Sequence, residues 1–245
     1  MKSKVFLFIS IAVAIAVFFT GCEEFVGPGQ EEESILPEEF SIDIPEAISF
    51  EVNAKTGTKS VNPINGNLIY LYLAHFICIG EGGGEIVEDI IKGIVRFGIN
   101  KPMSLSYASD DDGRIKNLVV MENPYFEGET WEFQLNITDA ESETNEDGGM
   151  ALQIFWNRRP IRGVAILKPY NIDRTNDENI QDAVFRVEYS EAGEKGYDAH
   201  MLVAASGLHV ADPLDNMYCA NALKMFVGKS GDMIDVFGNS NHPNA

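Results

Sequence analysis

The chain has 245 residues, a length that suits one or two globular domains. Hydrophobic residues make up 45% of it and charged residues 23%, a composition that excludes a wholly disordered protein. Its 38 acidic residues outnumber the 18 basic ones, and the net charge of −20 excludes nucleic acid as a partner, because phosphate binding needs cationic side chains. Three cysteines are too few for a small fold held together by disulfides.

The N-terminus has the pattern of a secretory signal. Lys2 and Lys4 precede sixteen residues without a formal charge, Val5 to Thr20. As a helix this run would be about 24 Å long, which is shorter than the roughly 30 Å hydrocarbon core of a bilayer. A positive start followed by an apolar run of this length is typical of a signal peptide. We therefore predict that residues 1–21 are a signal peptide.

The signal ends in Phe19-Thr20-Gly21-Cys22, where small residues leave the backbone accessible to a protease. This segment resembles the lipobox of bacterial lipoproteins. The resemblance implies cleavage before Cys22, a diacylglycerol thioether on the Cys22 sulfur and acylation of the new amino group. It also implies that the acyl chains hold the protein in the bacterial cell envelope, with the outer membrane as the expected location, facing the periplasm or the surface.

Residues 22–41 are predicted to form a flexible acidic tether. The chain from 22 to 54 has ten acidic residues and neither lysine nor arginine. Gly27-Pro28-Gly29 interrupts regular structure, and repulsion between like charges extends an unstructured chain. The tether would hold residues 42–245, expected to be a single globular domain, away from an anionic membrane. The small polar residues at the end of this domain leave open whether its C-terminus is complete.

The first part of the domain is predicted to be a helical hairpin. Apolar residues recur at three- and four-residue steps from Leu68 to Ile79 and again from Ile86 to Phe97. Gly82-Gly83-Gly84 lies between these runs and suits a turn between two helices. A buried strand is the alternative for the first run.

Beyond Pro102 the apolar period changes from 3.6 to 2, most clearly from Trp131 to Thr138. Short connectors suit β-hairpins. Consecutive strands without intervening helices predict an antiparallel β-meander, more readily closed as a barrel than packed as a sandwich. With the helical hairpin, the expected class is α+β. The expected strands lie at 103–107, 115–121, 131–138, 150–156, 161–167, 185–189, 200–205, 222–227 and 233–237.

No motif predicts a catalytic residue, a metal or a cofactor. The acidic turns lack EF-hand spacing, although residues 139–149 hold enough carboxylates for another kind of calcium site. Asp198, His200, His209 and Asp212 come nearest to a zinc cluster, but HExxH and CxxC motifs are absent. We therefore assign no catalytic residue, metal ligand or cofactor.

Two small groups of residues allow alternative interpretations. Arg158, Arg159 and Arg162 could hold an anionic ligand, although a charged turn that keeps a strand edge soluble is the simpler interpretation. Cys78 and Cys219 either form a disulfide, which an envelope compartment permits, or remain two buried thiols.

These observations predict a lipid-anchored envelope lipoprotein with a non-catalytic, β-rich binding or interaction domain. Its ligand could be a small molecule or a glycan bound at a barrel or sandwich mouth. The alternatives are an envelope hydrolase that uses His200 or His209, and a structural or adhesive surface subunit with exposed edge strands. Tyr107, Tyr125, Trp131 and Trp156 could line such a mouth, although a position in the hydrophobic core is the simpler interpretation and we do not assign them to a site.

Overall fold

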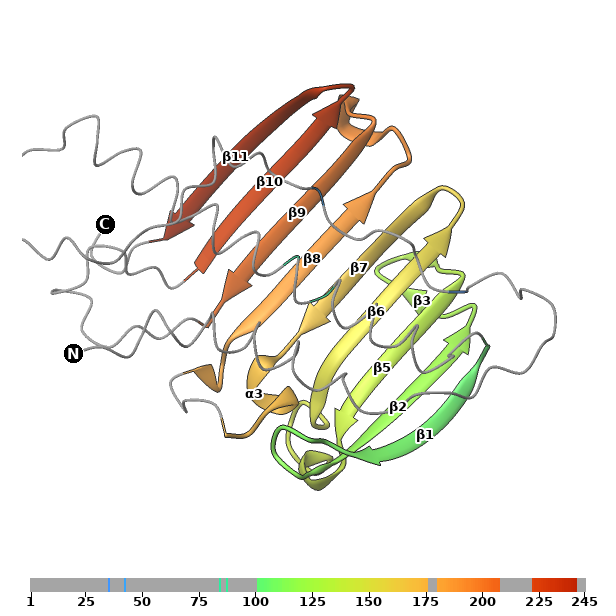
Figure 1. Ribbon diagram of the computed structural model, residues 1–245, viewed down its shortest axis with the longest axis vertical. Coiled ribbons are helices and arrows are strands. Elements are labelled where there is room, and N and C mark those ends of the chain that lie inside the picture. The colour runs from blue at the N-terminus through green and yellow to red at the C-terminus, as the bar shows by residue number, and fades with distance from the viewer. Residues whose placement is uncertain are drawn as a thin grey trace, which may run out of the picture.

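The computed structural model describes residues 101–175, 180–207 and 222–241, together with residues 35, 42, 84 and 87. This part of the chain is mainly one antiparallel sheet of nine strands (Figure 1). A separate hairpin of two short strands, β3 (Tyr125–Phe126) and β4 (Glu129–Thr130), lies between β2 and β5 in the chain. The large sheet consists of β1 (Met103–Ala108), β2 (Ile115–Glu122), β5 (Phe133–Asp139), β6 (Met150–Arg158), β7 (Ile161–Leu167), β8 (Val184–Ser190), β9 (Ala199–Ser206), β10 (Ala222–Ser230) and β11 (Met233–Asn241).

The sheet is an open meander. Its strands lie in the order β1-β2-β5-β6-β7-β8-β9-β10-β11, which places β1 and β11 at opposite edges. A barrel requires its two edge strands to pair with each other, so the expectation of a closed barrel is wrong. The described parts of the connections contain three short helical segments, η1 (Ala140–Ser142), α3 (Pro169–Ile172) and η3 (Glu194–Gly196).

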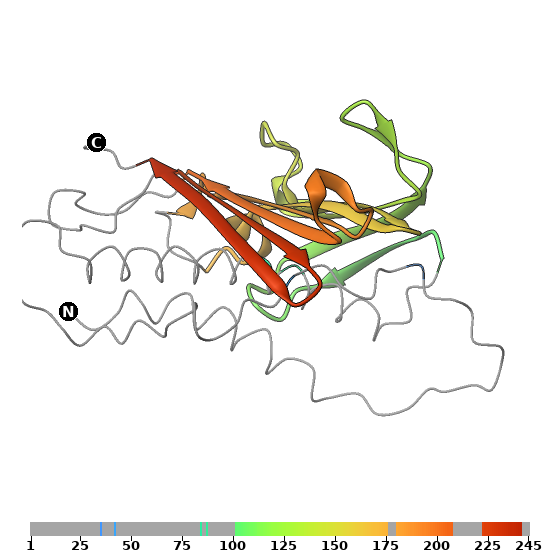
Figure 2. The same ribbon diagram turned by 90° about the horizontal axis from the view of Figure 1, so that it is seen from above.

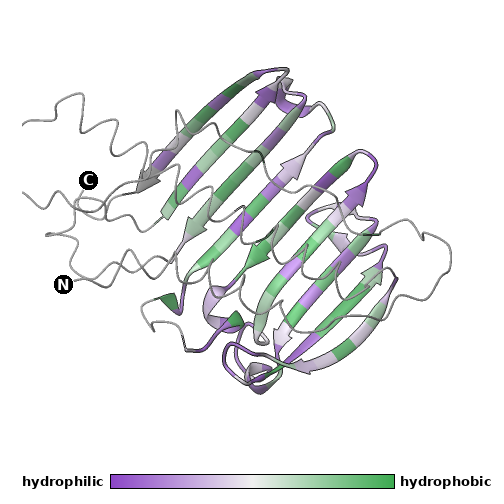
Figure 3. Cartoon of the chain, in the orientation of Figure 1, coloured by the Kyte–Doolittle hydropathy of each residue, from purple (hydrophilic) through white to green (hydrophobic). Residues whose placement is uncertain are grey.

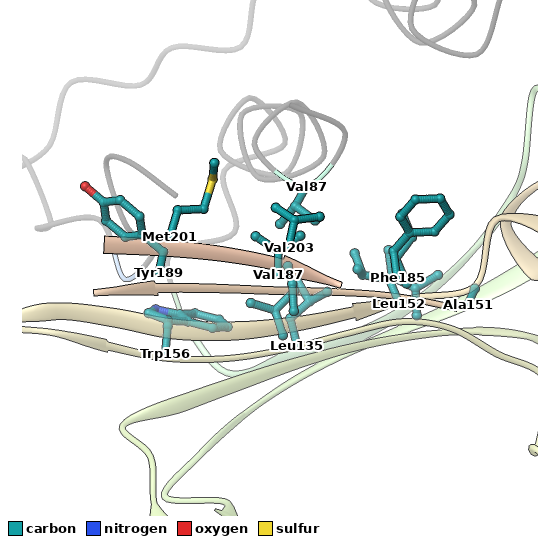
Figure 4. Close-up of a cluster of buried hydrophobic side chains, with 14 of the residues drawn as sticks. Val87, Leu135, Ala151, Leu152, Trp156, Phe185, Val187, Tyr189, Met201 and Val203 are labelled. Carbon is teal, nitrogen blue, oxygen red and sulfur yellow. The ribbon is translucent and has the colours of Figure 1, made fainter. Parts of the chain in front are cut away.

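One face of the sheet carries the main hydrophobic core, and we call it the apolar face. Because side chains alternate between the two faces of a strand, every second residue of the strands contributes to this core. Leu135, Val187 and Val203 are all 0% exposed. Figure 4 shows these side chains grouped together, although they come from three different strands.

Residues from outside the sheet complete this core. Ile35, Ile42 and Val87 are all buried in the same cluster, and Val87 lies over the sheet in Figure 4. The indole N–H of Trp156, on the apolar face, donates a hydrogen bond to the carbonyl oxygen of Ile35. These residues shield apolar side chains from water, so the sheet does not have to close on itself to bury them. This explains why the sheet remains open.

The expected helical hairpin is not seen in the described part of the chain, and the α+β class is corrected to mainly antiparallel β. Most of residues 67–97 lie outside that part, but Gly84 and Val87 both have helical backbone. Gly84 therefore belongs to a helix, not to the expected turn. Glycine costs a helix about 1 kcal/mol relative to alanine, and burial of a valine side chain contributes a similar or larger amount.

The opposite face, which we call the polar face, carries most of the charged side chains of the central strands. Hydrophilic and hydrophobic residues alternate along many of the strands in Figure 3. The green β3–β4 hairpin rises from one side of the sheet in Figure 2. A small second cluster anchors this hairpin, because the ring of Phe126 stacks on that of Phe155 with 4.0 Å between the ring centroids.

The last two strands are longer than the sequence indicates. The segment between the expected strands 222–227 and 233–237 shortens to a turn at Gly231 and Asp232, with Ser230 paired to Met233. Gly231 has φ +55°, and type II′ turns, which match the twist of a hairpin, place a glycine at this position. The polar residues 238–241, expected to follow the final strand, continue it instead and pair with β10.

Candidate functional site

Several of the predicted functional residues lie outside the described residues. These are Cys22, the expected lipid attachment site, the pair Cys78 and Cys219, and His209. Lipid attachment, the choice between a disulfide and two thiols, and a role for His209 therefore remain predictions. Within the ranges described, no helix has the length and apolar character needed to cross a membrane.

The arginines near the β6–β7 turn are engaged in contacts within the protein. Arg158 donates to Glu132, with 2.8 Å between its Nε and Oε1. Arg162 contacts Glu129 of the β3–β4 hairpin, where Nη2 and Oε2 are 2.8 Å apart. The guanidinium of Arg162 also lies 5.0 Å from the centroid of the Trp131 ring. These contacts give Arg158 and Arg162 a structural role, so we do not propose that they bind an anion.

In the acidic segment 139–149, Asp139 and Asp147 are also paired with cationic side chains of the protein. Asp139 is 0% exposed and accepts from Arg114 Nε at 2.8 Å and from Ser142 Oγ at 3.0 Å. Burial opposes ionisation of Asp139, but these hydrogen bonds and nearby cations lower its pKa overall. Asp147 pairs with Lys168 at 2.7 Å. Among the described residues, no group of three His, Cys, Asp or Glu side chains is arranged to hold a metal.

His200 lies on the polar face of β9 and is only 3% exposed. Its ring stacks on Phe226 at a centroid distance of 5.7 Å, and its Nδ1 has no hydrogen-bond partner in the described part. Burial and the charge of Lys195 lower the pKa of His200. The expected neighbour Asp198 precedes β9, and its Oδ2 accepts from the backbone N–H of Gly231 at 2.8 Å. Asp198 therefore stabilises the β10–β11 turn.

The most distinctive exposed feature is a group of apolar side chains on the polar face, at the β11 edge of the sheet. We call Tyr197, Phe226, Met233 and Phe237 the edge patch. Phe226 is central, with ring centroids 5.6 Å from Tyr197 and 6.2 Å from Phe237. Met233 is 71% exposed and Phe237 is 56% exposed. Exposed apolar groups of this kind mark interaction surfaces more often than isolated apolar residues do.

The backbone beneath the edge patch is adapted to it. A Cβ atom at Gly228 would lie 2.5 Å from the ring of Tyr197, so only glycine lets this ring rest on β10. The hydroxyl of Tyr197 donates to Asp235 on β11 at 3.1 Å. These contacts hold Tyr197 across the last two strands.

The aromatic candidates for lining a barrel mouth do not form a common site. Trp131 and Trp156 are 4% and 0% exposed, and each is buried in a different hydrophobic cluster. Tyr107 and Tyr125 are exposed, on β1 and β3 respectively. The edge patch was not expected, because residues 233–237 carry apolar side chains on both faces and local periodicity does not tell which face is covered.

Comparisons with protein-family models, with curated proteins and with solved structures found no match.

Proposed function

We propose that this chain is a lipid-anchored cell-envelope protein whose open sheet presents an interaction surface at the β11 edge. Two independent features support the two halves of this proposal. The segment Phe19-Thr20-Gly21-Cys22 supports the anchor, since the acyl chains implied by its lipobox-like pattern would bind a membrane stably. The edge patch supports the interaction.

The proposed interaction is supported by the exposure of the edge patch, which lies next to the unpaired edge of the described sheet. A partner that covered Phe237 and Met233 would bury their exposed apolar surface. This burial would favour binding by about 25 cal/mol for each Å² removed from water. A sheet edge also offers unpaired backbone groups for strand addition. The acidic tether at 22–41 would let this edge reach partners beyond the membrane surface.

The hydrolase alternative gains no support from His200. A general base has to reach the proton that it removes, whereas His200 is buried and packed against Phe226. Ser190, the residue paired with His200 on β8, is also only 3% exposed and donates to Glu194 at 3.2 Å. The geometry around His200 therefore favours a packing role.

Metabolic labelling tests the anchor directly. The full chain is expressed in bacteria that are grown with a clickable fatty acid, and the label on the purified protein is measured. We expect the unchanged chain and the matched control Cys78→Ala to carry the label, and Cys22→Ala to lose it. Equal label on Cys22→Ala and the unchanged chain would overturn the anchor.

A further inference from the structure

The backbone of β11 has one side free for pairing among the described strands. In a hairpin with a two-residue turn, the residues flanking the turn exchange hydrogen bonds, and hydrogen-bonded pairs recur at every second position. Ser230 and Met233 flank this turn. The odd-numbered residues of β11 therefore direct their backbone groups toward β10. The even-numbered residues from Ile234 to Ser240 direct theirs away from the sheet.

The β11 edge has few of the features that block pairing with another chain. Edge strands are usually protected by charges, prolines, bulges or short length. β11 has nine residues, no proline and a single charged side chain, Asp235, and its pairing with β10 is free of register shifts. The opposite edge strand, β1, has six residues and offers only Ser104, Ser106 and Ala108 on the polar face. β11 is therefore the edge better suited to a partner.

We propose that a second copy of this chain pairs with β11, so that two antiparallel β11 strands join the sheets of both copies around a two-fold axis at Phe237. This proposal rests on the proposed interaction function and names the partner. A symmetric pair of identical chains uses the same surface twice, which requires the strand to be complementary to itself.

The register centred on Phe237 gives this complementarity. It places Phe237 opposite its counterpart in a non-hydrogen-bonded pair, where side chains approach most closely and aromatic pairs stabilise a sheet. Asp235 then faces Asn239 of the partner copy. An axis at Asp235 would instead place two carboxylates opposite each other, which is destabilising. An axis at Val236 would place Asp235 opposite Phe237 and lose the aromatic pair.

Charges on the neighbouring strand favour the same register. Lys224 of β10 is exposed, and it is paired with Asn239 on the polar face. In the proposed dimer, Asp235 of the partner copy lies beyond Asn239, two strand spacings or about 10 Å from Lys224 between Cα atoms. The long lysine side chain can span this distance toward the carboxylate, so each copy would offer one cation to the carboxylate of the other.

Cysteine cross-linking of the full chain tests the pairing and its register. In the proposed dimer the two Cα atoms at position 237 are about 4.5 Å apart, within the range that a disulfide spans. Under mild oxidation we expect Phe237→Cys to give a several-fold higher yield of disulfide-linked dimer than the unchanged chain, which carries the native cysteines. Non-reducing electrophoresis measures this yield.

Asp235→Cys is the matched control, because it lies on the same strand and the same face. Its counterpart in the partner copy would be roughly 13 Å away along the strand, so the dimer yield should stay at the level of the unchanged chain. Combining Asp235→Cys with Asn239→Cys should restore cross-linking, because the proposed register places these positions opposite each other. This pair leaves Phe237 in place and shows that a thiol at position 235 can react.

Two results would overturn the dimer. Equal yields for Phe237→Cys and Asp235→Cys would indicate random collision or another register, and no yield above the unchanged chain for Phe237→Cys or the double variant would exclude the pairing. Gly238→Pro removes one outward N–H without removing a side chain and should lower the yield of the Asp235→Cys, Asn239→Cys double variant. Ser104→Pro on β1 should leave it unchanged. Fatty-acid labelling at Cys22 is measured separately, so failure of the anchor and failure of the dimer are distinguishable.

Discussion

At the residue scale, His200 is the side chain whose burial and hydrogen bonding differ most clearly from those of a histidine in water. Its side chain is 3% exposed and its Nδ1 lacks a hydrogen-bond partner among the described residues. Burial favours the neutral imidazole, and Lys195 opposes a second positive charge nearby, so the pKa of His200 is lowered. Periodicity alone predicts that residue 200 lies on a strand, but its burial depends on the packing of Phe226 from another strand.

The lowered pKa of His200 makes the stability of the fold depend on pH. The unfolded chain has an ordinary histidine pKa of about 6.5, so below that pH the unfolded state binds more protons than the folded state. We therefore expect the free energy of unfolding to fall between pH 7 and pH 5. His200→Phe should reduce this fall, because phenylalanine packs on Phe226 and does not titrate.

Urea unfolding at pH 7, 6 and 5 measures this difference between the unchanged chain and His200→Phe. The carboxylates with lowered pKa, such as Asp139 and Glu132, lose their stabilising charge only in a more acidic range. The window above pH 5 therefore separates their contribution from that of His200. The same pH dependence in both proteins would contradict the role assigned to the histidine.

At the scale of elements, the β3–β4 hairpin shows how tertiary contacts hold a segment that local sequence does not predict. Its strands have two residues each, too few for a period-2 pattern to be recognised. Glu127 of the hairpin accepts two hydrogen bonds from Arg186 of β8, at 2.7 and 2.6 Å. These partners are 59 residues apart, so no local pattern relates them.

Removing the Arg186 guanidinium should loosen this hairpin without unfolding the sheet. We expect Arg186→Met to speed amide hydrogen exchange at Tyr125–Thr130, while overall stability falls by about 1 kcal/mol or less, because such partly exposed ion pairs contribute little. Lys168→Met breaks a comparable contact with Asp147 on another loop and should leave exchange in the hairpin unchanged. Unchanged exchange in Arg186→Met would show that the other contacts, the Phe126–Phe155 stack and the Arg162–Glu129 pair, hold the hairpin without Arg186.

At the scale of the whole molecule, the apolar face of the sheet depends on residues far away in the chain. Val87 is 0% exposed and belongs to the same cluster as the sheet residues, together with Ile35 and Ile42. These three residues precede β1 and provide side chains that the open sheet itself lacks. The open architecture and this covering are therefore two aspects of the same packing.

A charge at Val87 should accordingly destabilise the whole fold. We expect Val87→Asp to lower the free energy of unfolding by at least about 3 kcal/mol, because it buries an unpaired carboxylate in the core. The matched control is Val119→Asp, on the half-exposed polar side of β2, where the new carboxylate stays hydrated and the cost should be about 1 kcal/mol. Urea unfolding measures both, and equal losses would contradict the covering role of Val87.

Alternation of apolar and polar side chains is a local property of each strand, so the sequence was sufficient to locate the nine strands of the large sheet but not β3 and β4. Antiparallel hairpins follow from short connectors such as the one at Gly231. Three features could be seen only in the folded chain: the sheet stays open, one of its faces is covered, and Phe237 is exposed at an edge. Those outcomes depend on contacts between residues far apart in the chain, such as Val87 with the sheet and Arg186 with Glu127, which no local periodicity encodes.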